Sequence, residues 1–116
     1  MFYYDFTVGN KTYKLRLNTR IICTLEKQIG CNPLLIFGDG DTIPTVSTMV
    51  NILYCALVQF NHGISLDDAF TIFDEWLSEG HTVTDFINVI LEIYKVSGLI
   101  AKGGEDEKNV NTEVGV

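Results

Sequence analysis

The chain has 116 residues, of which 47% are apolar and 20% are charged, and its formal net charge is −7 at pH 7. This composition is typical of one globular domain and excludes a disordered or fibrous chain. A domain of this size buries roughly 60–70% of the surface of its unfolded chain, which is enough for one core but not for a deep catalytic cleft as well. We therefore predict a non-enzymatic protein without a cofactor or a metal site.

The charges are distributed unevenly along the chain. Residues 1–27 carry five basic and two acidic side chains, whereas residues 28–94 carry nine acidic side chains and neither Lys nor Arg. Binding to phosphate groups needs clustered Lys and Arg, and an acidic body repels nucleic acid. This distribution argues against DNA or RNA as a partner.

Three cysteines, Cys23, Cys31 and Cys55, lack CxxC spacing and are odd in number, which predicts a reducing compartment. The first residues lack the basic segment of an export signal. The longest apolar run, 52–58, is far shorter than the ~20 residues that span a bilayer. We expect a soluble protein of the cytoplasm with no membrane partner.

A β-hairpin is predicted at the start of the chain. Residues 2–8 and 12–17 are rich in aromatic and β-branched side chains, and Gly9-Asn10 between them has the length of a tight turn. Alternation then divides the second strand into two faces. The apolar face carries Tyr13, Leu15 and Leu17, and the face expected to be exposed carries Thr12, Lys14 and Arg16.

The first helix is predicted over residues 19–29, with Asn18 as its N-cap and Gly30 at its C-terminal cap. Asn32-Pro33 can start a single helical turn over 34–37, and residues 38–41 are expected to form an exposed loop. Asp39 and Asp41 in that loop lack the remaining ligands of a calcium loop, so we interpret them as a solvated turn.

Two further helices are predicted in the middle of the chain. Thr45 can cap one that is apolar nearly all round and ends near residues 61–63, which places it inside the fold. Ser65 and Asp68 resemble a capping box that opens the next helix, which ends near Gly80. The face of this helix expected to point inward carries Leu66, Ala69, Phe70, Phe73, Trp76 and Leu77.

Thr84 is predicted to cap the last helix, whose polar stripe consists of Asp85, Asn88, Glu92 and Lys95. The other faces of this helix are largely apolar. Leaving a large aliphatic side chain in water forfeits about 1.5–3 kcal/mol, so few can stay exposed. This helix is therefore either the central core element or a helix with one flank that receives a partner chain.

Together these elements predict a mainly α fold, in which an N-terminal β-hairpin packs on a bundle of about four helices. We expect one domain over residues 1–101 and a flexible acidic tail over residues 102–116, which contain a Gly-Gly pair followed by Glu-Asp-Glu.

Catalytic and metal-binding arrangements are not predicted. His62 and His81 form no HxxxH or HExxH pair. The acidic pairs 67–68 and 74–75 are adjacent residues on a helix, which point about 100° apart and cannot meet across a substrate. The cysteines carry no catalytic signature.

Three segments between Lys14 and Ile100 resemble the tail assembly chaperones of long-tailed siphophages and of related prophages of Gram-positive bacteria. These segments are KLRLNTRIICTLEKQIGCNPLLIF, IPTVSTMVNILYCALVQFNHGISLDDAFTIFDEW and EGHTVTDFINVILEIYKVSGLI. The resemblance implies a helical protein that coats the hydrophobic tape measure protein, keeps it soluble and helps to recruit tail tube subunits. It also implies a longer form made by translational frameshifting, residence in the host bacterial cytoplasm and absence from the mature virion.

A groove lined with apolar side chains can accept an amphipathic client helix, and we assign that role to the last two helices. The expected client-binding residues are Ile87, Leu91, Tyr94, Leu99, Phe73 and Trp76. A basic hairpin end and an acidic body also predict a head-to-tail homo-oligomer. The expected self-association residues are Lys14, Arg16, Arg20, Asp74 and Glu75. Two alternatives remain open, a structural head-tail connector of the virion and a small ligand-binding regulatory domain.

Overall fold

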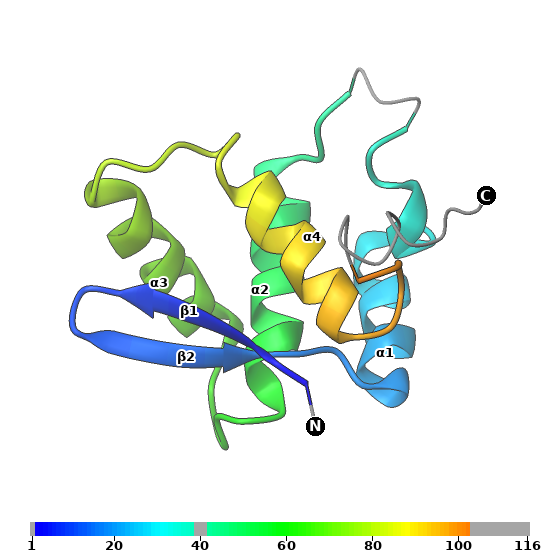
Figure 1. Ribbon diagram of the computed structural model, residues 1–116, viewed down its shortest axis with the longest axis horizontal. Helices are drawn as coiled ribbons and strands as arrows, with labels where there is room; N and C mark the ends of the chain where they lie inside the picture. The colour runs from blue at the N-terminus through cyan, green and yellow to red at the C-terminus, as the bar shows by residue number, and fades with distance from the viewer. Residues whose placement is uncertain (1, 39–41, 103–116) are drawn as a thin grey trace.

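The computed structural model describes residues 2–38 and 42–102, and the expected tail lies almost entirely outside this part of the chain. Its elements are β1 (Tyr4–Val8), β2 (Lys11–Leu15), α1 (Thr19–Ile29), a short 3-10 helix η1 (Pro33–Leu35), α2 (Val46–Val58), α3 (Leu66–Ser78) and α4 (Phe86–Val96) (Figure 1). The predicted fold class, mainly α with an N-terminal hairpin, is confirmed.

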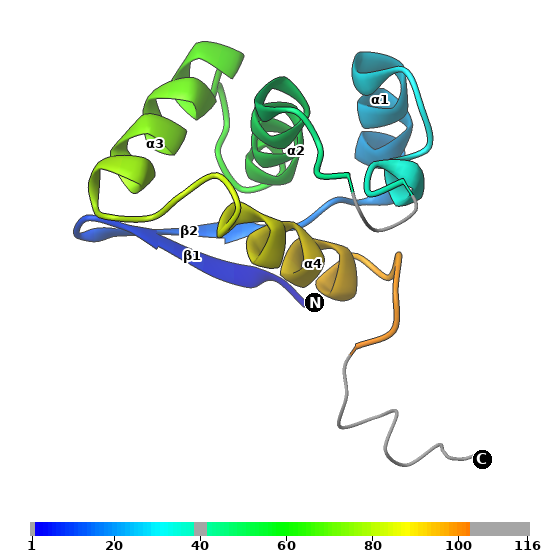
Figure 2. The ribbon, with the colours of Figure 1, turned by 90° about the horizontal axis from the view of Figure 1, so that it is seen from above.

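The elements form two layers. Helices α1, α2 and α3 stand side by side in one layer, and the hairpin and α4 form the other (Figure 2). Helix α2 is the central element, because it packs against α1, α3, α4 and β2. Seven of its side chains are buried, which confirms that this nearly all-apolar helix lies inside.

The hairpin has the predicted two-residue turn, with Val8 paired to Lys11 and Gly9 in the left-handed region at φ +62°. A positive φ is the reason glycine suits this tight turn. Phe6, Val8 and Leu15 bury one face of the hairpin against the helices. The turn is also attached to the helical layer, because the Gly9 N–H donates to the carboxylate of Glu79 just after α3.

Side-chain caps define the starts of α1, α2 and α3 as predicted. Asn18 accepts a hydrogen bond from the Ile21 N–H at 2.9 Å, and Thr45 accepts one from the Thr48 N–H at 3.1 Å. The capping box of α3 is complete, since the Asp68 N–H donates to Ser65 Oγ and the Ser65 N–H donates to the Asp68 carboxylate. Each cap satisfies a backbone donor that the first turn of a helix leaves free.

The prediction that Thr84 caps the last helix is wrong. The Thr82 N–H donates to Asp85 Oδ2 at 2.8 Å, and the Asp85 N–H donates to Thr82 Oγ1 at 3.2 Å. These reciprocal bonds close a tight turn ahead of α4, with the Phe86 N–H bonded to the Val83 carbonyl. Thr82 and Asp85 have the same spacing as a capping box, and this pair displaces Thr84 from the capping role.

The inward face of α3 also differs from the prediction. Ala69, Ile72, Phe73 and Trp76 are buried, whereas Leu66 and Phe70 are exposed. The buried residues follow the spacing i, i+3, i+4 and i+7, which is one stripe of a helix. Leu66 and Phe70 lie on the flank of that stripe and face away from the core.

Candidate functional site

The structure places three of the six expected client-binding residues in the core. Phe73, Trp76 and Tyr94 are at most 5% exposed. The ring of Phe73 lies 5.0 Å from that of Phe86, and the ring of Trp76 lies 5.7 Å from that of Phe6, measured between centroids. These aromatic side chains hold the hairpin against α3 and α4, so they are not available to a client on the surface.

The other three expected client residues, Ile87, Leu91 and Leu99, are half-buried. Ile87 and Leu99 pack against the buried core of the same chain. The apolar surplus of α4 is therefore used mainly within the protein, which is the first of the two roles that the sequence left open for this helix.

Four of the nine exposed large apolar side chains of the described residues belong to η1 and to the segment that leads into the first turn of α2. Leu34, Leu35, Ile43 and Val46 are all exposed, and Leu35 is the most exposed of the four at 66%. We call these four residues the η1 patch. Such a concentration of exposed apolar side chains is typical of an interaction surface, whereas single exposed residues are common on any protein.

The backbone around η1 explains why these leucines point outward. Pro33 is buried, and its carbonyl accepts a 2.8 Å hydrogen bond from the hydroxyl of Tyr94. Burial raises the pKa of Tyr94, which keeps its hydroxyl protonated as a donor. Asn32 caps the turn by accepting from the Leu34 N–H at 3.0 Å. With Pro33 facing inward, the next two side chains of the turn face solvent.

The two chain segments that carry the patch approach each other at Gly38 and Thr42. A Cβ built on Gly38 would lie 3.7 Å from the Cβ of Thr42, so the chain returns close to its starting point between these residues. Leu34 and Leu35 therefore precede the closure of this loop, and Ile43 follows it directly.

The sequence contained a signal for this patch that the prediction did not use. Residues 33–37 are Pro, Leu, Leu, Ile and Phe in succession. A single helical turn has side chains on all sides, so it cannot bury five consecutive apolar residues against one neighbour. Ile36 and Phe37 are half-buried and pack on the core, and Leu34 and Leu35 are left exposed.

The expected self-association residues lie in different places and serve different roles. Lys14 is exposed, with Nζ 4.9 Å from the centroid of the Tyr3 ring. Arg16 is half-buried, because its guanidinium donates to the Phe2 carbonyl and its N–H donates to the Ala56 carbonyl. Arg20 is exposed at the start of α1 and lines an open hollow of about 500 Å³. Arg16 thus contributes to the fold, which reduces the free basic surface of the hairpin.

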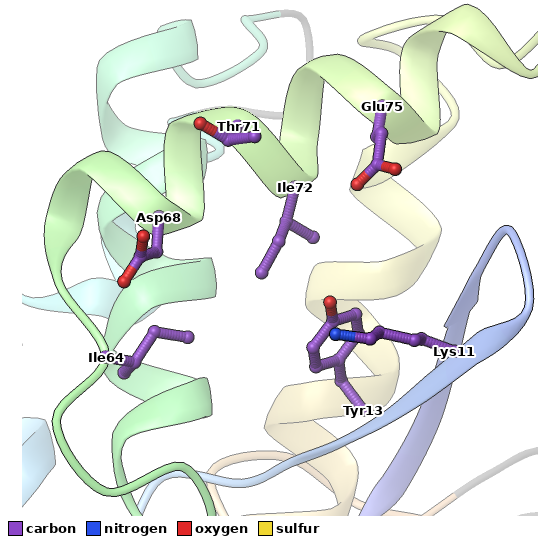
Figure 3. Close-up of a pocket in the computed structure, with 7 residues that line it drawn as sticks. All are labelled: Lys11, Tyr13, Ile64, Asp68, Thr71, Ile72 and Glu75. Atoms are coloured by element: carbon purple, nitrogen blue, oxygen red, sulfur yellow. The ribbon is translucent and has the colours of Figure 1, made fainter.

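Asp74 and Glu75 are exposed on α3, as expected for an acidic face. Glu75 lies at a groove of about 310 Å³ between β2 and α3 (Figure 3). The side of α3 contributes Asp68, Thr71, Ile72 and Glu75, β2 contributes Lys11 and Tyr13, and Ile64 lies in the preceding loop. Opposite charges of the hairpin and the body therefore meet at a groove within one chain.

Within residues 2–38 and 42–102, no three potential ligands among His, Cys, Asp and Glu come together as a metal site. His62 is exposed, and the His81 ring stacks on the Trp76 ring with centroids 4.2 Å apart. Asp39 and Asp41 lie outside the described residues.

The three thiols are expected to differ in reactivity. Cys23 and Cys31 are exposed, whereas Cys55 is buried and its Sγ lies 3.6 Å from Gln28 Oε1. Burial raises the pKa of the Cys55 thiol to about 11, which suppresses the reactive thiolate. A maleimide should therefore label two thiols of the native protein rapidly at neutral pH and the third only in denaturant, as counted by mass spectrometry. Rapid labelling of all three in the native protein would contradict the burial of Cys55.

The comparison with known families covers nearly the whole chain. A family model described as "Family of unknown function (DUF6096)" matches residues 5–115. The chain belongs to the DUF6096 family. No curated protein and no solved structure matches it. The description of DUF6096 assigns no function, so the resemblance of this DUF6096 chain to tail assembly chaperones stays a prediction. In the described part of the chain, no helix has the length and apolar character of a membrane span.

Proposed function

We propose that this protein is a non-enzymatic assembly factor that binds another polypeptide through the η1 patch. The sequence resemblance gives the client as a tape measure protein, which the factor keeps soluble while tail tube subunits are recruited. The observation that carries the proposal is the exposure of all four patch side chains on a fold whose core is otherwise well filled. Apolar surface of this kind is stabilised when a partner covers it.

The free energy gained by covering the patch is large enough to contribute to binding. Burying one large aliphatic side chain is worth about 1.5–3 kcal/mol, so a client that covers two or three patch residues offsets much of the cost of association. An amphipathic helix presents apolar side chains at i, i+3, i+4 and i+7, so it can cover several apolar side chains at once.

The acidic charge supports the second half of the function, which is solubility. Asp67, Asp68, Asp74 and Glu75 are exposed on α3, an element that contributes no residue to the patch. If the patch faces the client, these carboxylates remain in water, and their mutual repulsion keeps coated complexes apart.

Co-expression with a tape measure protein tests the proposal. We expect the tape measure protein to be soluble with the natural chain and to aggregate when Leu34→Asp and Leu35→Asp are combined. The matched control combines Leu66→Asp and Phe70→Asp, which are exposed on α3, and it should retain the soluble client. A tape measure protein that is equally soluble without the chain, or with the patch variant, would contradict the proposal.

A further inference from the structure

The outer edge of β2 presents unpaired backbone groups close to the hairpin turn. A two-residue turn makes the residues that flank it a hydrogen-bonded pair, so the backbone N–H and C=O groups of Thr12 and Lys14 point away from β1. Arg16 is next in this alternation, and its N–H donates to the Ala56 carbonyl at 3.1 Å. Elsewhere in the described part of the chain, no partner reaches the outward backbone groups of Thr12 and Lys14. The edge is therefore closed at Arg16 and free at these two residues.

The groove between β2 and α3 lies beside this free edge (Figure 3). Its middle is apolar, because Tyr13 points into it from β2 and Ile64 and Ile72 face it from the side of α3. A strand added to β2 would send every second side chain to the same side as Tyr13. The rim of the groove has charges of both signs, from Lys11, Asp68 and Glu75. The groove therefore fits an apolar side chain at the centre of an added strand.

The other face of β2 favours an acidic residue on an added strand. Lys14 is exposed on that face, with Nζ 4.9 Å from the centroid of the Tyr3 ring. Asp5 is its neighbour across the hairpin, but the two form no ion pair within 4.0 Å. A lysine on a strand edge discourages pairing with most other strands, whereas an opposite charge directly across from it stabilises the pair. Lys14 thus makes the edge selective for a segment that carries a carboxylate at this position.

We propose that the free edge of β2 binds an extended segment of another polypeptide as a third strand, and that this segment contains an acidic, a β-branched apolar and a polar residue in succession. In the antiparallel register, the acidic residue lies opposite Lys14 and the polar residue lies opposite Thr12. Each of these two pairs exchanges two backbone hydrogen bonds. The central residue lies beside Tyr13 and enters the groove.

This site is separate from the client surface of the proposed function. The η1 patch consists of Leu34, Leu35, Ile43 and Val46, and none of these residues belongs to β2 or α3. The inference therefore does not rest on client binding, and each site can be tested with the other one disrupted.

Amide hydrogen exchange of the full chain, measured by NMR with the peptide acetyl-Thr-Thr-Glu-Val-Thr-Thr-amide, tests the proposal. At ten times its dissociation constant, the peptide should slow exchange of the Thr12 and Lys14 amides about tenfold, because these amides exchange only from the free state. The Asp5 and Thr7 amides face the other edge of the hairpin and should not change. The Phe6 amide, inside the hairpin, should stay protected throughout and thereby show that the fold is intact.

Methylated peptides test whether the contact is a strand pair. N-methylation of the Glu removes an N–H that faces β2 and should abolish binding, whereas N-methylation of the Val removes one that faces away and should leave binding nearly unchanged. Equal binding of the two methylated peptides would contradict strand addition. Lack of binding by the unmodified peptide at 10 mM, a concentration of about ten times a millimolar dissociation constant, would overturn the proposal.

A charge exchange tests the register. A peptide with Lys in place of Glu should bind the natural chain at least about threefold more weakly, and Lys14→Glu should restore its binding while weakening that of the original peptide. The matched control combines Leu34→Asp and Leu35→Asp, which should bind the original peptide as the natural chain does. Loss of binding in this control would place the peptide on the η1 patch and overturn the proposal. Thr12 and Lys14 amides that are already protected without peptide would mean that the edge is covered, which would also overturn it.

Discussion

Replacing Phe73 by alanine is expected to lower the free energy of unfolding by about 3–5 kcal/mol. Phe73 is 2% exposed, and its ring packs edge-on against that of Phe86. The variant loses the transfer free energy of the ring, leaves a cavity between α3 and α4, and gives up the aromatic pair. Because domain stability is typically only ~5–15 kcal/mol, this loss should be large and visible in urea denaturation followed by circular dichroism.

Phe70→Ala is the matched control, since it is the same substitution on the same helix less than one turn away. Phe70 is 41% exposed, so its removal should cost about 1 kcal/mol or less. The comparison separates the observed inward face of α3 from the predicted one, in which both residues were buried. Equal losses for the two variants would mean that α3 is rotated relative to the structure described here.

A carboxylate at Ile90 is expected to prevent folding, whereas one at Leu91 is expected to be tolerated. Ile90 is fully buried, and Ile90→Asp would place a charge without a partner in the core, at a cost of at least ~4 kcal/mol. Leu91 is half-buried on the adjacent face of α4. The soluble yield and the thermal transition of each purified variant would measure the difference.

The Leu91→Asp variant also decides between two surfaces for the proposed client. If α4 is a core element and the η1 patch binds, this variant should keep the tape measure protein soluble as well as the natural chain does. If the variant folds but no longer keeps the tape measure protein soluble, the client surface lies on the flank of α4, as the sequence predicted. The η1 patch is then not sufficient for client binding.

Local chemistry explains why most elements could be predicted. Asn18, Thr45 and Ser65 each cap the helix that follows them, and Gly9-Asn10 forms the predicted turn. Such signals involve neighbours within three or four residues, so they are present in the sequence before any tertiary contact forms. The Thr82–Asp85 pair was missed, although it too is a local signal with the spacing of a capping box. It closes the turn ahead of α4, directly before the buried Phe86.

The candidate surface was harder to predict, because burial depends on how helices are rotated against one another. Phe70 and Phe73 are both aromatic residues on α3, and the sequence gives no sign of which one faces the core. Phe73 packs against the ring of Phe86, which belongs to α4, whereas Phe70 faces solvent. Three of the predicted client residues, Phe73, Trp76 and Tyr94, are therefore unavailable to a client, because α3 and α4 bury these aromatic side chains in the core.

The sequence by itself determined the hairpin, the helices with most of their caps, the central position of α2 and the acidic body, because periodicity, capping and charge are local properties. The tertiary structure alone decided that Phe73 and Trp76 of α3 join Phe86 and Tyr94 of α4 in the core, and that the leucines of η1 remain exposed. It also formed the groove between β2 and α3. The physical reason is that exposure is set by the neighbours a side chain meets after folding, and these come from distant parts of the chain.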